Sequence, residues 1–538
     1  MRLRIPSPTR LGLPAKFTSW RPNQEAAIGD LLEQSGDMVI AHAHPTGAGK
    51  SLIYMAAARV IPEIRTVILT STKALQDQLA SEFAGIAADI RGQNAYNCKA
   101  VNGVSCADGP CRSGFVCPHK ESKDCPYQYA LEKARSSQIV VTNYSYWLYS
   151  NRYGDGLGPV DRLVLDEAHD APRVLADFLT VTLTEEDLHK TLRADLPKYR
   201  TIQNWKRWAQ ITATDVEEAL ASVTKILSKG TMSAGALESA ARLRRLLHSL
   251  ESLCSEVGND WVFKRDQRGV RFGAVTMTAG QTKRFLFGPV DSVYMTSATI
   301  SPTTLQLLGN VSVRFREFPE VFPKERRWVT AVSCPRLRHD STEADLSEWC
   351  ERIDKVLENR LDRKGIIHCH AYSRRDFLAE RSRFRDHFFT NSRHNTRDVL
   401  AEFKRAKPPA IFVSPSLVAG YDFPHDECRF QIVAKLPFPN MQDALFKARI
   451  DRVPELLHYL TAQSVVQAAG RGVRSVDDYC ETFIMDGNFG AWWWEQNRYL
   501  TPKWFRESVR FSRTVPFPEQ ALPMSGDEHP KKEDEING

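Results

Sequence analysis

The sequence lacks the segments that would place a protein in or across a membrane. Its 538 residues contain no positively charged start followed by an apolar signal core. They also contain no apolar run of about 18 residues, the length that a helix needs to cross a bilayer. We therefore expect a cytoplasmic protein with no membrane partner.

The sequence also has little excess of charge and no disulfide framework. A formal net charge of +7 permits a nucleic-acid partner but does not indicate one by itself. Eleven cysteines in so long a chain do not suggest a small disulfide-stapled scaffold. The length, with 42% hydrophobic residues, excludes a single small module and predicts more than one domain.

The clearest local signal is a phosphate loop, His44 to Ser51, with the sequence HPTGAGKS. An apolar run precedes it and a helix-compatible segment, 52–59, follows, which predicts a strand, a turn and a helix. Glycines let backbone N–H groups turn toward a phosphate, Lys50 adds a charge and Ser51 a Mg²⁺ ligand. Because a full pattern of this kind begins with glycine and this chain has His44, an ordinary turn before a helix is the alternative.

An acidic strand end is the second chemical signal. The apolar run 163–165 is followed by Asp166 and Glu167. A carboxylate there can hold Mg²⁺ through water, and its neighbour can orient the water that attacks the γ-phosphate. A surface turn is the alternative for the tetrapeptide alone, but it rarely coincides with an apolar strand and an upstream phosphate loop.

Two further segments carry groups suited to a nucleotide. Arg21 and Gln24 stand near the start of a predicted helix, where a glutamine can satisfy a donor and an acceptor of adenine, with a capping turn as the alternative. Arg471 and Arg474 lie three positions apart on one predicted helical face. An arginine supplied from a second domain can stabilise the charge on a leaving γ-phosphate, whereas in isolation this segment reads as a basic turn.

Strand and helix patterns alternate in two separate parts of the chain. They predict two α/β units, with a helical insertion at about residues 170–280 in the first. Basic residues of this insertion could touch nucleic acid or form a solvated face.

Five segments, taken in order, resemble the motifs of superfamily 2 helicases of the DEAH type, and more narrowly the iron–sulfur group of XPD and DinG. They are PTGAGKS at 45–51, KALQDQL at 73–79, DEAH at 166–169, TSAT at 296–299 and QAAGRGVR at 467–474. The resemblance covers about residues 20 to 490. It implies an ATP-dependent DNA helicase that moves 5′-to-3′ along single-stranded DNA and opens forked duplex DNA.

The resemblance also implies an α/β fold with two RecA-like motor domains, and with an iron–sulfur domain and a helical arch domain inserted in the first. The expected parts are a lead-in, 1–19; motor domain 1 in three pieces, 20–95, 138–170 and 286–307; the iron–sulfur domain, 96–137; the arch, 171–285; motor domain 2, 308–522; and a disordered tail, 523–538.

Site roles follow from the same resemblance. The candidate catalytic residues are Lys50, Asp166, Glu167, Arg471 and Arg474; the nucleotide-binding candidates are Arg21, Gln24, Thr46, Gly47, Ala48, Gly49, Lys50, Ser51 and Gln467; and the Mg²⁺ ligands are Ser51 and Asp166. Ala419 stands where the family commonly has glutamate, which puts any role of that side chain in doubt.

Five cysteines fall within residues 98–125, where the family places its iron–sulfur domain. Four thiolates hold a [4Fe-4S] cluster, and the resemblance favours Cys98, Cys111, Cys117 and Cys125, leaving Cys106 spare. Zinc is the rival, although it generally uses cysteine pairs two to four residues apart, which only Cys106 and Cys111 approach. Free structural thiols are a third reading.

Rival functions stay open at this point. One is an ATP-dependent translocase or remodeller that does not separate strands, and another is a non-catalytic nucleic-acid-binding scaffold that has kept a nucleotide pocket. We expect a monomeric motor without exonuclease activity, with a recruiting protein or ribonucleoprotein as a possible partner. Repair, recombination, plasmid or phage replication, and interference all remain possible host processes.

Overall fold

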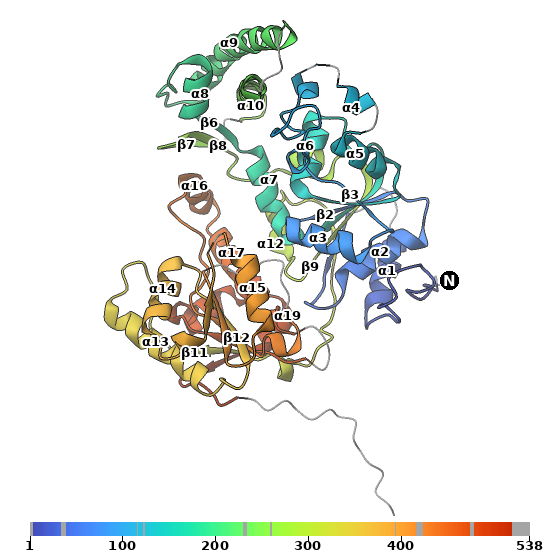
Figure 1. Ribbon diagram of the computed structural model, residues 1–538. Coiled ribbons are helices and arrows are strands. Elements are labelled where there is room, and N and C mark those ends of the chain that lie inside the picture. The colour runs from blue at the N-terminus through green and yellow to red at the C-terminus, as the bar shows by residue number, and fades with distance from the viewer. Residues whose placement is uncertain are drawn as a thin grey trace, which may run out of the picture. The chain divides into compact units, whose positions relative to one another are not determined.

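The computed structural model describes ten stretches of the chain (Figure 1), namely residues 4–33, 39–113, 115, 117–121, 124–229, 234–258, 261–392, 394–415, 423–473 and 478–518. The chain divides into two compact units. Unit 1 comprises Met1–His44, Ala48–Phe318 and Pro439–Leu457, and unit 2 comprises Pro45–Gly47, Pro319–Phe438 and His458–Gly538.

Unit 1 is built on a seven-stranded parallel sheet in the order β10-β1-β9-β5-β2-β4-β3. Its strands are β1 (Val39–Ala43), β2 (Thr66–Thr70), β3 (Ala88–Asp89), β4 (Ile139–Asn143), β5 (Val160–Asp166), β9 (Val290–Ser297) and β10 (Arg314–Glu317). The central strands β2 and β5 each contain a short apolar run, 67–69 and 163–165, as expected for a parallel sheet with both faces covered. Because β10 pairs with β1, the sheet extends past the predicted end of motor domain 1 at residue 307.

Helices cover both faces of this sheet. They are α1 (Gln24–Leu32), α2 (Lys50–Val60), α3 (Lys73–Glu82), α5 (Pro126–Ser136), α6 (Tyr144–Tyr153), α7 (Ala171–Leu179) and α12 (Pro302–Leu307). Side chains alternate across a strand, so Ile68 of β2 packs in one core with α1 and α2, whereas Val67 and Leu69 pack in the other with α5, α6 and α7. Both faces are therefore buried.

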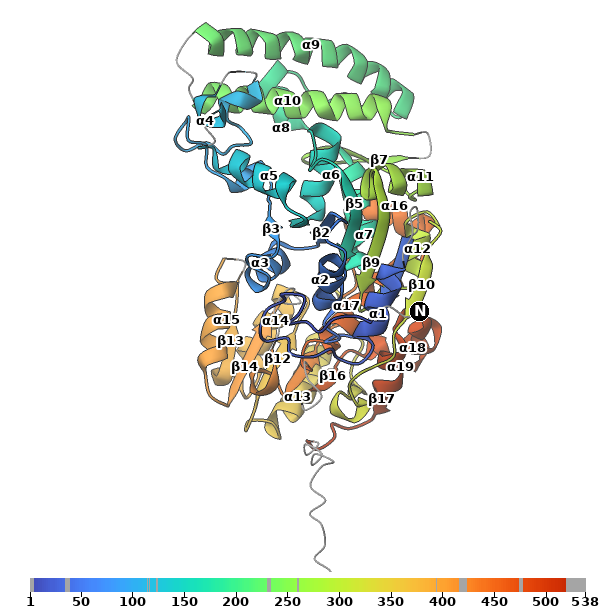
Figure 2. The same ribbon diagram turned by 90° about the vertical axis from the view of Figure 1, so that its right-hand side faces the viewer.

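A helical and antiparallel region is inserted after α7. It contains α8 (Glu185–Leu192), α9 (Ile202–Lys229), α10 (Ala234–Ser255) and a three-stranded sheet of β6 (Val181–Thr184), β8 (Gly269–Gly273) and β7 (Val262–Asp266). The long helices α9 and α10 run side by side (Figure 2). Trp205 of α9 meets Phe272 of β8 edge-on, with ring centroids 5.5 Å apart, so the helices and the small sheet share one core.

The remaining helical segments of unit 1 are short. They are η1 (Gln93–Ala95), η2 (Pro110–Ser113), α4 (Pro118–Glu121), η3 (Ala168–Asp170), α11 (Ala279–Gln281) and η4 (Thr282–Phe287).

Unit 2 has a second seven-stranded parallel sheet, in the order β13-β14-β12-β15-β16-β11-β17. Its strands are β11 (Val329–Val332), β12 (Lys364–His368), β13 (Phe388–Thr390), β14 (Ala410–Ser414), β15 (Phe430–Val433), β16 (Glu481–Ile484) and β17 (Val509–Ser512). Its helices are α13 (Glu343–Glu358), α14 (Tyr372–Arg381), α15 (Thr396–Arg405), α17 (Glu455–Ala469), α18 (Ala491–Asn497) and α19 (Lys503–Ser508), and the first turn of α17 belongs to unit 1. Its short helical turns are η5 (Lys324–Arg326), η6 (Arg385–His387), η7 (His425–Glu427), η8 (Gly487–Phe489) and η9 (Arg498–Leu500). The predicted pair of α/β domains with parallel sheets is confirmed.

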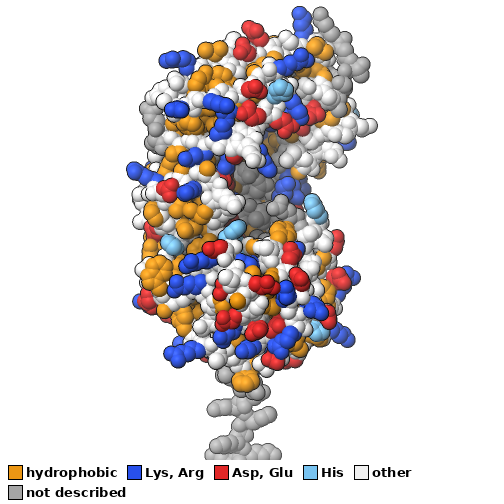
Figure 3. All heavy atoms as spheres, turned by 90° about the vertical axis from the view of Figure 1, so that its left-hand side faces the viewer, with side chains coloured by type: hydrophobic (Ala, Val, Ile, Leu, Met, Phe, Trp, Pro, Cys, Tyr) orange, Lys and Arg blue, Asp and Glu red, His pale blue; other side chains and the backbone are white. Residues whose placement is uncertain are grey.

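The sequence predicts no membrane-spanning helix and little excess of charge, and the helices and the surface can be compared with these two expectations. None of the helices in the described stretches combines the length and apolar character needed to cross a membrane. On the face shown in Figure 3, Lys and Arg side chains are mixed with Asp and Glu side chains. Among the described residues on that face, the two signs of charge are therefore interspersed.

A buried ion pair in unit 2 joins Arg360, two residues after the end of α13, to Glu481 at the start of β16. Arg360 Nε and Nη2 each donate to a carboxylate oxygen of Glu481 at 2.8 Å, and the Arg360 side chain is fully buried. The guanidinium also lies 4.6 Å from the ring centroid of Phe483. Removal of one partner would leave an uncompensated charge in the core.

Arg360→Ala should therefore lower the free energy of unfolding of unit 2 by about 3–5 kcal/mol. Denaturant unfolding followed by tryptophan fluorescence measures this. Arg381→Ala is the matched control, because it breaks the exposed Arg381–Glu343 pair and should cost less than about 1 kcal/mol. Equal effects of the two substitutions would contradict a stabilising role for the buried pair.

Candidate nucleotide-binding site

The phosphate loop connects β1 to α2, as the sequence predicts. Gly47 has φ 79° and Gly49, the residue before α2, has φ 73°, conformations that a residue with a side chain rarely adopts. Helix α2 then buries Leu52 to Ala58 against the sheet. The first backbone N–H groups of α2, Lys50 and Ser51 thus stand at the carboxyl end of β1, where a helix N-terminus favours an anion.

Gln24 lies against the phosphate loop. Its side chain is buried, its Nε2 donates to the carbonyl of Ala48 at 2.9 Å, and its Oε1 accepts from the backbone N–H of Arg21 at 2.8 Å. Asn23 before it has φ 68° and starts α1. The structure therefore brings the two predicted adenine-side residues next to the predicted phosphate-binding residues.

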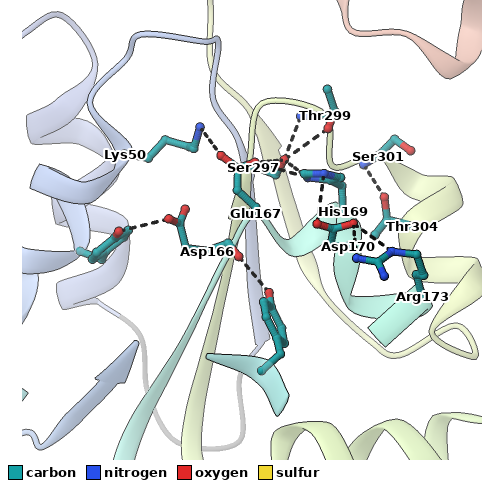
Figure 4. A network of polar contacts seen from close by, with 12 residues as sticks. Lys50, Asp166, Glu167, His169, Asp170, Arg173, Ser297, Thr299, Ser301 and Thr304 are labelled. Carbon is teal, nitrogen blue, oxygen red and sulfur yellow. Dashed lines mark hydrogen bonds and ion pairs between the residues drawn. The ribbon is translucent and has the colours of Figure 1, made fainter. Parts of the chain in front are cut away.

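Lys50 faces the acidic pair at the end of β5 (Figure 4). Its Nζ lies 3.2 Å from Glu167 Oε1. Asp166 is 7% exposed, and its Oδ2 accepts from the hydroxyl of Tyr54 at 3.3 Å, while its carbonyl accepts from Tyr144 at 3.0 Å. Asp166 Oδ1 is buried without a hydrogen-bond partner among the described residues.

The two neighbouring carboxyl groups have opposite pKa shifts. Burial raises the pKa of Asp166 to about 7, and the charge of Glu167 adds to this shift. Burial also acts to raise the pKa of Glu167, but Lys50 and His169 outweigh it and hold that pKa well below its usual range. Glu167 is therefore the ionised member of the pair, and Asp166 is a carboxyl group that a cation would keep ionised.

A second set of contacts joins Glu167 to the end of β9 (Figure 4). Ser297 Oγ donates to Glu167 Oε2 at 3.1 Å, and His169 Nδ1 lies 2.7 Å from the same hydroxyl. Thr299 N–H donates to Ser297 Oγ at 3.1 Å. The acidic motif and the Thr-Ser-Ala-Thr segment therefore form one network. A change in the contacts of Glu167 would alter the hydrogen bonds of Ser297 at the end of β9.

His44 has a packing role at the base of the phosphate loop. Its ring stacks on Phe318 with centroids 4.5 Å apart, and its Nε2 lies 3.3 Å from the hydroxyl of Tyr294. The Tyr294 hydroxyl also lies 3.3 Å from His42 Nδ1. Burial lowers the pKa of His44 well below its usual value, so the ring is neutral. Its departure from the glycine of a full pattern is explained by this aromatic cluster.

The late arginine segment belongs to unit 2 and follows α17. Gln467 lies in that helix, but Arg471 comes two residues after its end, in a turn, so the prediction that Arg471 lies on a helical face is wrong. Burial lowers the pKa of His368 at the end of β12 to about 3, and the nearby charge of Arg471 adds to this effect. Arg474 and Ala419 lie outside the described residues.

All five cysteines of the predicted iron–sulfur segment line one cavity of about 1120 Å³ in unit 1. Cys106 Sγ lies 3.9 Å from Cys125 Sγ, so the cysteine that was expected to be spare is next to a predicted ligand. Burial raises the pKa of Cys106 to about 12, and Cys125 adds to this shift. Within the described stretches, no three His, Cys, Asp or Glu side chains are grouped closely enough to hold a metal ion.

Two tyrosines of the site have no predicted role. Tyr54 lies one helical turn after Lys50 on the same face of α2, a spacing that the sequence shows. Tyr144 starts α6 and reaches Asp166 from a separate strand connection, which no local pattern indicates.

Two family models match the chain. The DEAD/DEAH box helicase model matches residues 21–177, and the helicase C-terminal domain model matches residues 358–508. Together they cover more than half of the chain, and they contain the phosphate loop, the acidic pair and the late arginine segment. The chain therefore contains a DEAD/DEAH box helicase domain and a helicase C-terminal domain.

Individual relatives and solved structures show which helicases the chain is similar to. The chain is 21% identical to the ATP-dependent DNA helicase YoaA of Haemophilus influenzae, over 89% of this chain and 93% of that protein, and 21% identical to YoaA of Escherichia coli, over 88% and 93%. Its fold is similar to that of an XPD helicase, with a TM-score of 0.59, 16% identity and coverage of 92% of this chain and 100% of that chain. The Xpd4 protein of S. tokodaii gives a TM-score of 0.54 at 13% identity, over 91% of this chain and 100% of that one. Together with the two domain matches, these likenesses support the resemblance to superfamily 2 helicases of the XPD and DinG type.

Glu167→Gln should lower ATP turnover about 10²- to 10⁴-fold, because the amide cannot take a proton from water. Phosphate release in the presence of single-stranded DNA measures turnover, and nucleotide binding should persist. Glu186→Gln is the matched control, since Glu186 pairs with Lys190 on the exposed surface of α8. Unchanged turnover in Glu167→Gln would exclude Glu167 from the reaction.

Proposed function

We propose that the protein is an ATP-dependent DNA helicase that moves 5′-to-3′ along single-stranded DNA and separates forked duplex DNA. The observation that carries the proposal is the continuous network from Lys50 through Glu167 and Ser297 to His169, which joins the phosphate loop, the acidic pair and β9 in one site. The matching helicase families and the helicase relatives support the same activity.

The residues of the phosphate loop and of the adenine side have distinct tasks in this proposal. The loop Thr46 to Ser51 binds the phosphates, with Lys50 at the β- and γ-phosphates. Because Lys50 pairs with Glu167 in this structure, an arriving phosphate would exchange for that carboxylate and free it to orient the attacking water. Gln24 and Arg21 contribute to the adenine side.

Mg²⁺ fits the donor set at the end of β5. Asp166 Oδ1 is buried without a hydrogen-bond partner in the described residues, and a carboxylate oxygen in that position suits a hard cation. Ser51 and Asp166 would hold the ion, which when bound neutralises charge on the phosphates. Tyr54 and Tyr144 keep Asp166 oriented.

Unit 2 contributes the residues that would respond to the γ-phosphate. In the proposal Arg471 and Arg474 stabilise the charge that develops as it leaves, and Gln467 contacts the nucleotide. Hydrolysis then depends on both motor domains, which is how ATP turnover would drive steps along DNA.

The domain plan is proposed with one adjustment. The iron–sulfur domain at 96–137 and the arch at 171–285 are insertions in motor domain 1. Pairing of β10 with β1 supports ending motor domain 1 at residue 317 instead of 307. Along the sequence, motor domain 2 then runs to residue 522, although its segment Pro439–Leu457 packs in unit 1.

The cavity of about 1120 Å³ in unit 1 suits a single strand. Its lining includes the half-exposed rings of Tyr149 and Tyr153 and the charges of Lys73, Arg112 and Arg245. Single-strand sites combine such aromatic faces with basic groups along the backbone. We place the translocating strand in this cavity, between α6, α10 and the cysteine segment.

Four of the five cysteines are proposed to hold a [4Fe-4S] cluster. Five thiols lining one cavity supply enough soft ligands, and such a cluster would cross-link a segment whose described residues form only short helices. The set suggested by sequence is Cys98, Cys111, Cys117 and Cys125. Cys106 competes for a place in it, because its sulfur lies 3.9 Å from that of Cys125.

The cellular location, the oligomeric state and the recruiting partner rest on the sequence resemblance to the helicase family alone. We propose a cytoplasmic monomer, directed to its DNA by a recruiting protein or ribonucleoprotein.

Pure protein with ATP and Mg²⁺ should separate a partial duplex that carries a 5′ single-stranded tail and leave one with a 3′ tail intact. Gel analysis of both substrates, with phosphate release measured in parallel, tests this. DNA-stimulated phosphate release without strand separation would support the translocase instead. Turnover that survives Lys50→Ala would support the non-catalytic scaffold.

Protein purified without oxygen should contain iron and sulfide and absorb visible light. Cys125→Ser should remove the absorption, whereas Cys254→Ser should not, because Cys254 lies in α10 outside the segment. Comparing Cys106→Ser with Cys111→Ser by iron content identifies the spare thiol. Colourless protein with stoichiometric zinc would contradict the cluster.

A further inference from the structure

One segment of the chain belongs to a different unit from its neighbours in sequence. The chain leaves unit 2 after Phe438, contributes Pro439–Leu457 to unit 1, and returns to unit 2 at His458. This segment, which we name the brace, carries α16 (Ala444–Arg452). Figures 1 and 2 both show α16 beside the small antiparallel sheet of unit 1. None of the proposed nucleotide contacts uses the brace.

Asp443 fixes the start of α16 to β8. Both of its carboxylate oxygens accept from the guanidinium of Arg271, at 2.9 and 3.0 Å. Asp443 Oδ1 also accepts from the backbone N–H groups of Leu445 and Phe446, each at 3.0 Å. One carboxylate is thus both the cap of the brace helix and a bidentate partner of β8, a strong and directional arrangement.

Arg449 joins α16 to the residue after β8 and to α7. Its Nε donates to the carbonyl of Ala274 just after β8 at 3.1 Å. Its Nη2 lies 3.3 Å from both the carbonyl of Ala176 in α7 and the hydroxyl of Thr180 at the end of that helix. Helix α7 begins directly after the acidic motif, so Arg449 connects the brace to the element that leaves the nucleotide site.

Apolar contacts complete the attachment. Leu445 and Ile450 are buried, and the methyl groups of Leu445 lie directly over Gly273 of β8. A Cβ atom at Gly273 would come within 2.7 Å of Leu445 Cδ2, so this glycine lets α16 lie close against the strand. The brace is therefore a packed part of unit 1, although its two ends are covalently joined to unit 2.

We propose that the brace is the mechanical link through which movement of unit 2 reaches the inserted arch region. The chain connection transmits force from unit 2 to α16, and Asp443 and Arg449 pass it to β8 and α7. The inference rests on the proposed helicase function and deepens it, because it names positioning residues that couple ATP turnover to strand separation without touching nucleotide.

The test uses variants that loosen the brace without removing its helix. Asp443→Ser keeps an N-cap hydroxyl but is neutral and too short to reach Arg271. Arg449→Ala removes the contacts with Ala274, Ala176 and Thr180. Glu238→Gln is the matched control, because it breaks an exposed ion pair with Arg242 on α10, away from α16. Thermal unfolding verifies that each variant is folded.

In the double variant, separation of forked duplex should fall about tenfold or more, an effect of the size seen for coupling residues, while DNA-stimulated phosphate release stays within about twofold of wild type. The control should match wild type in both assays. Unchanged strand separation in the folded double variant would overturn the proposal. Parallel loss of both activities would also overturn it, because the brace would then serve the nucleotide site itself.

A second measurement tests the brace proposal independently of the proposed helicase function. Displacement of streptavidin from biotinylated single-stranded DNA reports force along the strand without any duplex. If wild-type protein displaces streptavidin but never opens duplex, the helicase function fails. The brace proposal then holds if the double variant displaces streptavidin about tenfold more slowly at equal phosphate release, and is overturned if it matches wild type.

Discussion

The charge of two adjacent acidic residues at the end of β5 is the constraint around which unit 1 is organised. Asp166 is buried and Glu167 is ionised, so the site needs positive charge and hydrogen-bond donors close by. Lys50 supplies the charge from the phosphate loop. The hydroxyls of Tyr54 and Ser297 supply donors from α2 and β9, which explains why these distant segments converge on one strand end.

Parallel strand order makes this convergence possible. Strand β5 pairs with β9, and β9 pairs with β1, so the phosphate loop, the acidic pair and Ser297 all leave the same edge of the sheet. Lys50 pairs with Glu167 in this structure, and in the proposed function an arriving phosphate exchanges for that carboxylate. Binding of a nucleotide would then replace an internal contact of Glu167. Because Ser297 donates to Glu167, the end of β9 would respond to that change.

Local patterns were sufficient for much of the fold and for part of the site. The phosphate loop and the strand before Asp166 follow from apolar runs bounded by turn residues, and the two α/β units follow from alternating strand and helix patterns; the structure confirms them. Contacts between distant segments could not be predicted in this way. Tyr144 reaching Asp166 and His44 stacking on Phe318 depend on strand order and packing, which no single stretch of sequence encodes. The assignment of Pro439–Leu457 to unit 1 is of the same kind, since its helical pattern does not say which sheet it covers.

The most direct test of this account is a crystal structure of the protein with Mg²⁺ and a non-hydrolysable ATP analogue. The account predicts an ion beside Asp166 and Ser51, phosphates on the loop from Thr46 to Ser51, and Lys50 Nζ moved from Glu167 to the γ-phosphate. A nucleotide bound elsewhere, or one that leaves the Lys50–Glu167 contact of 3.2 Å unchanged, would contradict it.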